Sequence, residues 1–402
     1  MTVARPTDRP RSASAVPAAP TTGGTTEAML RRFAADVRPQ ARQLVRASPR
    51  AGDLATAFPG ALHVMADPAT EQARREQSFL LADGGAPLKD VAEALGLGLW
   101  MRRLPPEAFH GGLPALDVTE SFARRISNRL PTSRRSSRFW LESISFAHRS
   151  GDEDFAIWLA DKIEPLGEGK PEALFRVLAA YAWFSRSGAV AGRDLIAVRW
   201  RPEMALETAI CAAKSWLNRL RLVCQLPPGA VDDAWLVAGE VDGVTITPLL
   251  DAPSLLDESR AMNNCADQYA DKIARDRCRL FSMRRNGAPI ATVEIAGHPR
   301  EPVMLTLTQL KTRNNLPAPP EVWRLAYRWL SEQPSIGRAP VLLPPPRPLS
   351  RRIWQELFEP YRAARSGAAW IPPAPTTAAI VSLEADIGEL ARAANVTSWL
   401  FR

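Results

Sequence analysis

Hydrophobic positions along the chain follow two different periods. From residue 116 to 225, apolar residues recur every three or four positions, with breaks at Pro131, at Gly151 and in the segments 167–171 and 187–192. This spacing predicts α-helices, and similar spacing begins near Glu27. From residue 232 the period shortens to two, which is typical of β-strands.

Residues 232–335 contain five alternating runs. Two pairs of runs are joined by Asp242-Gly243 and Asn286-Gly287, which favour two-residue hairpin turns, and the fifth run is 303–311. Helical spacing predicts one helix at about 257–274 and another at about 320–332. The order β-β-α-β-β-β-α predicts an α+β fold, in which a small antiparallel sheet carries helices.

The pattern predicts four parts. Residues 1–26 are rich in Pro, Ser, Thr, Gly and Ala and lack an apolar period, so we expect a disordered arm. An all-α region over 27–231 and the α+β module over 232–335 follow. Residues 336–402 form a proline-rich and helical C-terminal extension, which either wraps onto the rest of the chain or stands apart as an appendage.

Composition narrows the class of protein. Of the 402 residues, 46% are hydrophobic and 23% are charged, as in ordinary globular proteins. Because the chain has neither an 18-residue apolar stretch nor the apolar core of a signal peptide, we expect a cytoplasmic protein with no membrane partner. Its four cysteines lack C-x-x-C spacing, and it has four histidines; we expect reduced thiols, no metal site and no cofactor.

The net charge of +8 is unevenly distributed. Residues 1–50 carry nine arginines against three acidic residues, whereas residues 232–335 hold 12 basic and 14 acidic residues. Six further arginines lie between Glu120 and Glu142 with no acid among them: Arg124, Arg125, Arg129, Arg134, Arg135 and Arg138. Such a run either binds nucleic-acid phosphates or forms a solvated helix face, and the sequence leaves both interpretations open.

Residues 86–109 have some features of a helix-turn-helix motif, with Ala92 in the position of the small residue of the first helix and Gly96 in the position of the turn. The apolar phase then fails, and Pro105-Pro106 would end a second helix after about two turns. The stretch therefore predicts a short helical pair that packs into the core, rather than an element that reads DNA.

Cys265 is the most conspicuous candidate for chemistry. In a helix over 257–274, Met262, Cys265, Tyr269 and Ile273 would share the apolar face, which predicts a small buried thiol packed against the sheet. Alternatively, Cys265 lies at the rim of a pocket with the Tyr269 hydroxyl beside it and His298 as a base, or the pocket binds a ligand without covalent chemistry.

Polar residues on the last two strands form the second candidate cluster. Alternation places Ile290, Thr292 and Glu294 on one face, and it places Leu305, Leu307, Gln309 and Lys311 together on the next strand. If these faces coincide, the polar side chains gather at one end of the sheet, near Arg313 in the following loop. The candidate catalytic residues are then Cys265, Tyr269 and Glu294, and the candidate ligand-binding residues are Asn264, Thr292, Gln309, Lys311, Asn314 and Asn315. An exposed sheet end with cross-strand ion pairs is the alternative.

Residues 232–335 resemble the PcfJ-like family, which is named after a product of the transfer region of a conjugative plasmid. The matching landmarks are Met262, Cys265 and Tyr269, Phe281-Ser282 with Arg284, the run Ala291-Thr292-Val293-Glu294, and Gln309 followed by Asn314 or Asn315. The helical stretch 88–109 is also similar to N-terminal parts of long bacterial members. The resemblance implies an association with mobile genetic elements and conjugation, and no specific activity. In the family pattern a histidine commonly precedes the cysteine, whereas Asn264 stands here and cannot accept a proton from the thiol.

Three functions remain open. The first is an accessory factor that associates with nucleic acid or a nucleoprotein complex through its arginines. The second is an enzyme, a hydrolase or transferase, centred on Cys265, Tyr269, Glu294 and Gln309. The third is a non-catalytic scaffold whose helical region binds a protein partner.

Overall fold

The computed structural model describes residues 22–114, 116, 118–166, 169–188, 190–337, 348–398 and 400. Residues 1–21 of the predicted arm and 338–347 of the proline-rich segment lie outside this part of the chain. Two compact units are present: unit 1 contains Met1–Pro114 and Thr119–Arg138, and unit 2 contains Ala115–Val118 and Phe139–Arg402. The helical residues from 139 onward thus belong to the same unit as the sheet.

Unit 1 is built from short helices. Their bounds are α1 Thr22–Leu30, α2 Arg38–Ala47, α3 Pro49–Ala57, α4 Pro59–Ala66, α5 Gln72–Asp83, α6 Leu88–Ala94 and α7 Glu120–Ile126. Helix α1 begins within the range predicted to be disordered. Prolines lie in the first turns of α2, α3 and α4, where their missing N–H group leaves no hydrogen bond unmade. Every residue of α4 is buried, so α4 is the central helix of the unit.

The stretch that has features of a helix-turn-helix does not form one. After α6 the chain turns at Gly96, whose φ is +68°, and continues as two 3₁₀ helices, Leu99–Arg103 and Pro106–Phe109. Trp100 and Met101 are buried. The first of these 3₁₀ helices buries its apolar side chains in the core of unit 1, in agreement with the sequence prediction. With five residues it is too short to act as a recognition helix.

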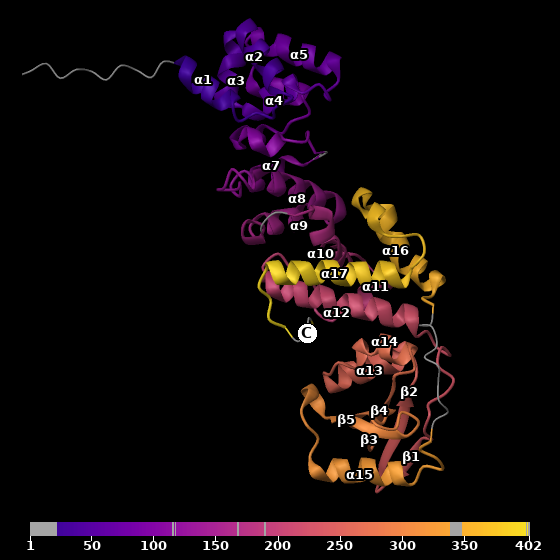
Figure 1. Ribbon diagram of the computed structural model, residues 1–402. Coiled ribbons are helices and arrows are strands. Elements are labelled where there is room, and N and C mark those ends of the chain that lie inside the picture. The colour runs from indigo at the N-terminus through magenta and orange to yellow at the C-terminus, as the bar shows by residue number, and fades with distance from the viewer. Residues whose placement is uncertain are drawn as a thin grey trace, which may run out of the picture. The chain divides into compact units, whose positions relative to one another are not determined.

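Both C-terminal helices, α16 and α17, pack into the helical part of unit 2. Its helices are α8 Ser137–Ser150, α9 Glu153–Ala160, α10 Pro171–Arg186, α11 Ala191–Asp194, α12 Leu206–Gln225, α16 Arg351–Ala364 and α17 Thr377–Ala393. Helices α10, α12 and α17 lie side by side (Figure 1). The Tyr361 hydroxyl donates to the carbonyl of Ser150 at 2.7 Å, and the Ser350 N–H donates to the carbonyl of Cys224 at 2.7 Å. The C-terminal extension therefore packs onto the helical layer.

The sheet is a five-stranded antiparallel meander, so the chain has the predicted α+β fold. Its strands are β1 Gly239–Val241, β2 Val244–Leu249, β3 Cys278–Arg285, β4 Ala288–Gly297 and β5 Leu305–Lys311, in that spatial order. Both central turn residues have positive φ at Asp242-Gly243 and at Asn286-Gly287, as the two-residue turn requires. The sequence therefore predicted both hairpins correctly.

Each face of the sheet is covered by a different set of helices. Helix α15, Pro320–Ser331, packs on the apolar face, where Trp329 lies 4.9 Å from Phe281 between ring centroids. Helices α13, Ala252–Met262, and α14, Ala270–Ala274, lie over the opposite face (Figure 1). This second face carries polar side chains, so the sheet separates an apolar core from a polar layer.

Two β-bulges correct the predicted strand faces. Glu294 pairs with Gln309 and Ile295 with Leu307, which leaves Thr308 unpaired. The extra residue reverses the alternation of β5, so Leu305 and Leu307 join the apolar core instead of sharing a face with Gln309 and Lys311. A second register shift, between Met283 and Arg284, leaves Ile290 without a partner, and Ile290 packs against the core rather than beside Thr292 and Glu294.

Candidate functional site

The position of Cys265 is set by a break in the predicted helix. Helix α13 ends at Met262, and Asn263 follows in the left-handed conformation with φ 47°. The Ser259 hydroxyl donates to the carbonyl of Asn264 at 2.8 Å, and Asn264 Nδ2 donates to Thr292 Oγ1 on β4 at 2.9 Å. The continuous helix predicted over 257–274 is therefore wrong, because these bonds give the backbone alternatives to helix. Cys265 lies in the break and is half-buried.

The predicted polar residues converge on one cavity of about 20 Å³ over the polar face of the sheet. Side chains reach it from the helix break and the short turn before α14, from β3, β4 and β5, and from the loop after β5. Its lining residues are Asn264, Cys265, Ala266, Tyr269, Leu280, Thr292, Glu294, Gln309, Lys311 and Asn315. The sequence candidates for catalysis and ligand binding are among them, except Asn314 and the candidate base His298. The volume suits a single water molecule, so a larger ligand must lie at the mouth or part the loops.

Glu294 is held by two neighbours. The Tyr269 hydroxyl donates to Glu294 Oε2 at 2.7 Å, while Lys272 Nζ lies 3.9 Å from Oε1 and 4.6 Å from the centroid of the Tyr269 ring. The carboxylate is only 8% exposed. One oxygen is thus fixed by a short hydrogen bond, and the other has an ammonium group beyond hydrogen-bond distance.

Asparagines in the left-handed conformation form the rim. Asn263 Nδ2 donates to Asn314 Oδ1 at 2.7 Å, and Cys265 Sγ donates to Asn315 Oδ1 at 3.5 Å. Asn314 and Asn315 have φ of 60° and 59°. Asparagine adopts this conformation more readily than other residues with a side chain, which accounts for its repeated use here. Asn314 therefore closes the rim rather than lining the cavity.

The electrostatics keep Cys265 and Tyr269 protonated at neutral pH. Burial raises the pKa of the Cys265 thiol, and the nearby carboxylates of Asp267 and Glu294 raise it further against the opposing effect of Lys272. Burial and Glu294 likewise raise the pKa of Tyr269. His298, the predicted base, lies beyond the end of β4, where its Nδ1 accepts from the Arg300 N–H, and it does not line the cavity. No imidazole among the described residues lines the cavity to take the proton of the thiol.

Glu258, which the sequence analysis did not identify, is a buried carboxylate that bonds a residue of the cavity wall, Thr292. Glu258 on α13 is 0% exposed and accepts from Thr292 Oγ1 at 2.6 Å, from Ser282 Oγ at 2.7 Å and from Arg284 at 3.3 Å. The spacing of apolar residues could have identified it. Glu258 lies three residues after Leu255 and four before Met262, so helical periodicity places it on the buried, apolar face of the helix. Through Thr292, this network fixes Asn264 and the break.

Ion pairs with α12 hold the other side of the segment. Arg219 Nε lies 2.7 Å from Asp267 Oδ2, and Arg221 bonds both Asp271, at 2.6 Å, and Glu384 of α17. Asp267 is 3% exposed. Asp267 can be buried because the Arg219 guanidinium neutralises its carboxylate, which would otherwise be costly to remove from water. The segment that carries Cys265 and Tyr269 is therefore fastened to both the sheet and the helical layer.

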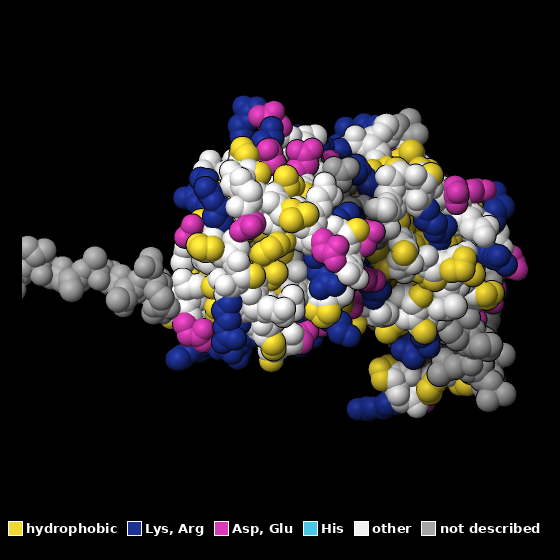
Figure 2. Space-filling view, turned by 90° about the horizontal axis from the view of Figure 1, so that it is seen from above, with side chains coloured by type: hydrophobic (Ala, Val, Ile, Leu, Met, Phe, Trp, Pro, Cys, Tyr) yellow, Lys and Arg dark blue, Asp and Glu magenta, His cyan; other side chains and the backbone are white. Residues whose placement is uncertain are grey.

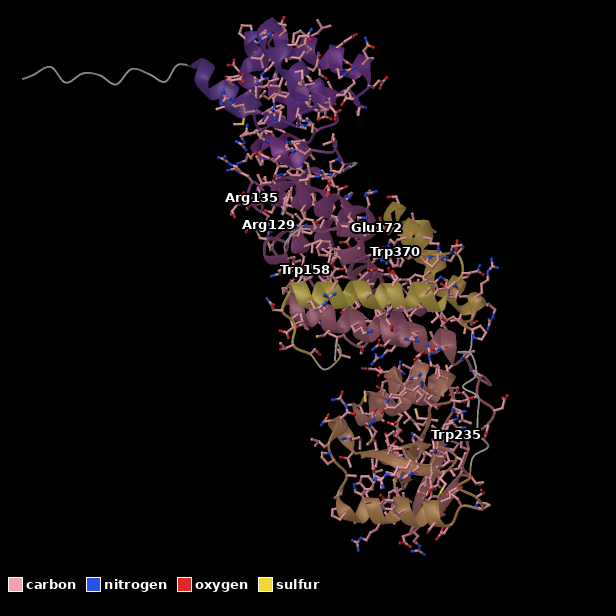
Figure 3. The ribbon with its side chains drawn as sticks, viewed as in Figure 1. Arg129, Arg135, Trp158, Glu172, Trp235 and Trp370 are labelled. Atoms are coloured by element: carbon pink, nitrogen blue, oxygen red, sulfur yellow. The ribbon has the colours of Figure 1, made fainter. Side chains whose placement is uncertain are left out.

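The arginine run lies in unit 1, separate from this cavity. Arg124, Arg134, Arg135 and Arg138 are exposed, and Arg125 and Arg129 are half-buried. Figure 3 labels Arg129 and Arg135 in the segment that follows α7. Arg124 is within 3.4 Å of Glu120, and Arg129 donates to the carbonyl of Arg125 at 3.0 Å. On the face shown in Figure 2, basic and acidic side chains are interspersed rather than segregated.

In the part of the chain that the structure describes, no cluster of three or more His, Cys, Asp or Glu side chains is placed to hold a metal ion. None of the helices described has the length and apolar character needed to cross a bilayer. Comparison of the chain with protein-family models, with curated proteins and with solved structures found no match.

Proposed function

We propose that the α+β module is an enzyme, a hydrolase or transferase, in which Glu294 provides acid–base catalysis at the polar-face cavity. The observation that carries this proposal is the convergence of polar side chains from separate chain segments on one cavity that contains a buried carboxylate. Such a concave site with a few converging polar groups is where binding and catalysis are found in most enzymes.

The proposed chemistry is proton transfer at Glu294. Oε2 is occupied by the Tyr269 hydroxyl, so Oε1 is the atom available to accept a proton. A water molecule in the cavity, or a hydroxyl group of an acceptor, would lose its proton to Oε1 as its oxygen bonds to an electrophilic atom of a ligand at the mouth. The leaving group would then take the proton from Glu294. Tyr269 and Lys272 would hold the carboxylate in place.

Cys265 is not assigned the role of nucleophile. Its pKa is raised by burial, and no imidazole lines the cavity. The proposal instead uses Cys265 as a donor that positions Asn315. The landmarks on which the resemblance to the PcfJ-like family rests include Ser282, Thr292 and Glu294, so the proposal applies to the part of the chain that carries that resemblance.

Replacing Glu294 by glutamine is expected to lower turnover by about 100- to 10,000-fold, because the amide keeps the bond from Tyr269 but cannot accept a proton. The measurement is a survey of ester, amide, glycoside and phosphate-ester substrates with the full chain, followed by kinetics of the wild type and of E294Q on any substrate that is turned over. E301Q is the matched control, since Glu301 is exposed in the loop after β4.

Unchanged melting of E294Q would show that the variant is folded. C265S should lose much less activity than E294Q, because a serine hydroxyl also donates to Asn315. Equal rates for E294Q and the wild type, or no turnover of any compound in the survey, would refute the proposal.

As a second candidate function, we propose that unit 1 binds nucleic acid through the exposed arginines of the run. Counterion release then makes the logarithm of the binding constant fall linearly with the logarithm of salt concentration. Replacing Arg134 and Arg135 by glutamine together should reduce the slope by up to about 1.8 for duplex DNA. Gel shifts with a 30-base-pair duplex at a series of salt concentrations measure this effect.

The pair Arg351 and Arg352 provides the matched control, since both are exposed on α16 of unit 2. Their replacement by glutamine should leave the slope unchanged. If the wild type does not bind the duplex even at low salt, or if both double variants behave alike, the arginine run is a solvated face and this second candidate is rejected.

A further inference from the structure

Three polar side chains at the mouth of the cavity have hydrogen-bonding capacity to spare. Lys311 makes no ion pair with any residue that the structure describes, and the Gln309 amide has no side-chain hydrogen bond within the same part of the chain. Asn315 uses Oδ1 to accept from Cys265 and keeps Nδ2 as a donor. All three come from β5 and the loop that follows it, so they lie on one side of the cavity.

The charges at the site do not balance without a ligand. Glu294 is matched by Lys272 at 3.9 Å, Asp267 by Arg219, and Glu258 by Arg284. Of the two charged side chains that line the cavity, Lys311 has no ion-pair partner among the described residues. A monoanion would neutralise it, whereas a dianion would leave excess negative charge close to Glu294.

The strand register sets the positions of these groups. Lys311 pairs with Thr292 and Gln309 with Glu294, and the bulge at Thr308 turns both β5 side chains toward the polar face. An anionic group between Lys311 and Gln309 would therefore lie directly across the strand pair from Glu294. Because the cavity has room for about one water molecule, the anionic group would lie at its mouth, with the remainder of the ligand outside.

We infer that Lys311, Gln309 and Asn315 form a subsite for a carboxylate group of the ligand. This inference deepens the proposed function and rests on it for the identity of the reacting site, because the subsite would orient a carboxylate-bearing substrate with its reacting atom near Glu294. An ammonium group and two amide donors match the acceptor-only character of a carboxylate.

The test uses the full chain with ¹⁵N-labelled glutamine and asparagine side chains. Propionate, propionamide and inorganic phosphate are titrated separately at pH 7 and low salt, and the side-chain amide signals of Gln309 and Asn315 are followed by NMR. Propionate should give saturable shifts at both amides and bind at least about tenfold more tightly than propionamide or phosphate. K311M should weaken propionate binding by about tenfold or more. K89M, at an exposed lysine of unit 1, should not change it.

The outcomes separate this inference from the proposed function. No saturable propionate shift, equal binding of phosphate, or equal affinity in K311M would overturn the carboxylate subsite, even if E294Q abolishes turnover. Propionate binding that depends on Lys311 would support the subsite, even if E294Q leaves turnover intact and the catalytic role of Glu294 fails.

Discussion

Replacing Glu258 by alanine is expected to lower the free energy of unfolding of the α+β module by about 3–5 kcal/mol. The side chain is fully buried, and its carboxylate accepts hydrogen bonds from Ser282, Thr292 and Arg284. Alanine would leave two buried hydroxyl groups and a half-buried guanidinium without their acceptor, and it would also open a cavity. Because Thr292 in turn accepts from Asn264, the helix break at Cys265 should loosen as well.

The neighbouring residue supplies a control. Asp257 has a side chain that is 73% exposed, and among the described residues it pairs only with Arg260, at 3.4 Å, so D257A should change stability by less than about 0.5 kcal/mol. Urea unfolding followed by the fluorescence of Trp329, which lies in the core of the module, measures both variants. A loss for E258A no larger than that for D257A would show that the network contributes little.

Acidification from pH 6.5 toward pH 4 is expected to destabilise unit 1 by roughly 3 kcal/mol through a single residue, His63. His63 lies on the buried helix α4 and is 1% exposed, and neither ring nitrogen has a hydrogen-bond partner among the residues that the structure describes. Its ring stacks on Phe33 at 5.5 Å and on His110 at 6.0 Å between centroids. Burial, with a smaller contribution from His110, lowers the pKa of His63 to about 4, although Asp67 and Asp36 oppose the change.

The sign follows from proton binding. Well above pH 6.5 the imidazole is neutral in both the folded and the unfolded chain, so it does not couple stability to pH. Between pH 6.5 and 4 the unfolded chain binds a proton that the folded core excludes, and folding becomes progressively less favourable. The pKa of His63 is lowered because a charged imidazole would be buried without a partner that offsets the loss of water.

Thermal unfolding of the full chain at a series of pH values, with hydrogen exchange assigning each transition to its unit, tests this prediction. H63L should remove the loss between pH 6.5 and 4, and it should raise stability at neutral pH because two unsatisfied polar atoms leave the core. H298Q, at the half-buried His298 of unit 2, should leave the transition of unit 1 unchanged. Persistence of the same acid sensitivity in H63L would assign it to other groups.

The sequence determined those parts of the fold that depend on neighbours along the chain. Both hairpins follow from Asp242-Gly243 and Asn286-Gly287, because Gly, Asn and Asp adopt positive φ at low cost whatever surrounds them. The succession of strands and helices along the module and the α+β class followed from the alternation between those turns. Most of the candidate site could also be predicted, since side chains two residues apart on a strand share a face unless a bulge intervenes.

Tertiary structure decided the remaining features, because each depends on contacts between segments far apart in the sequence. The bulge at Thr308 reverses the side chains of β5, and a shift of one residue cannot be read from alternation alone. The break at Asn263 forms where the bond from Asn264 to Thr292 competes with helix, so Cys265 leaves the apolar stripe on which periodicity had placed it. Glu258 and Asp267 are buried as carboxylates because Arg284 and Arg219 reach them from other elements. Period and propensity describe the cost of a local conformation, whereas the fate of a buried charge depends on the partner that the fold brings to it.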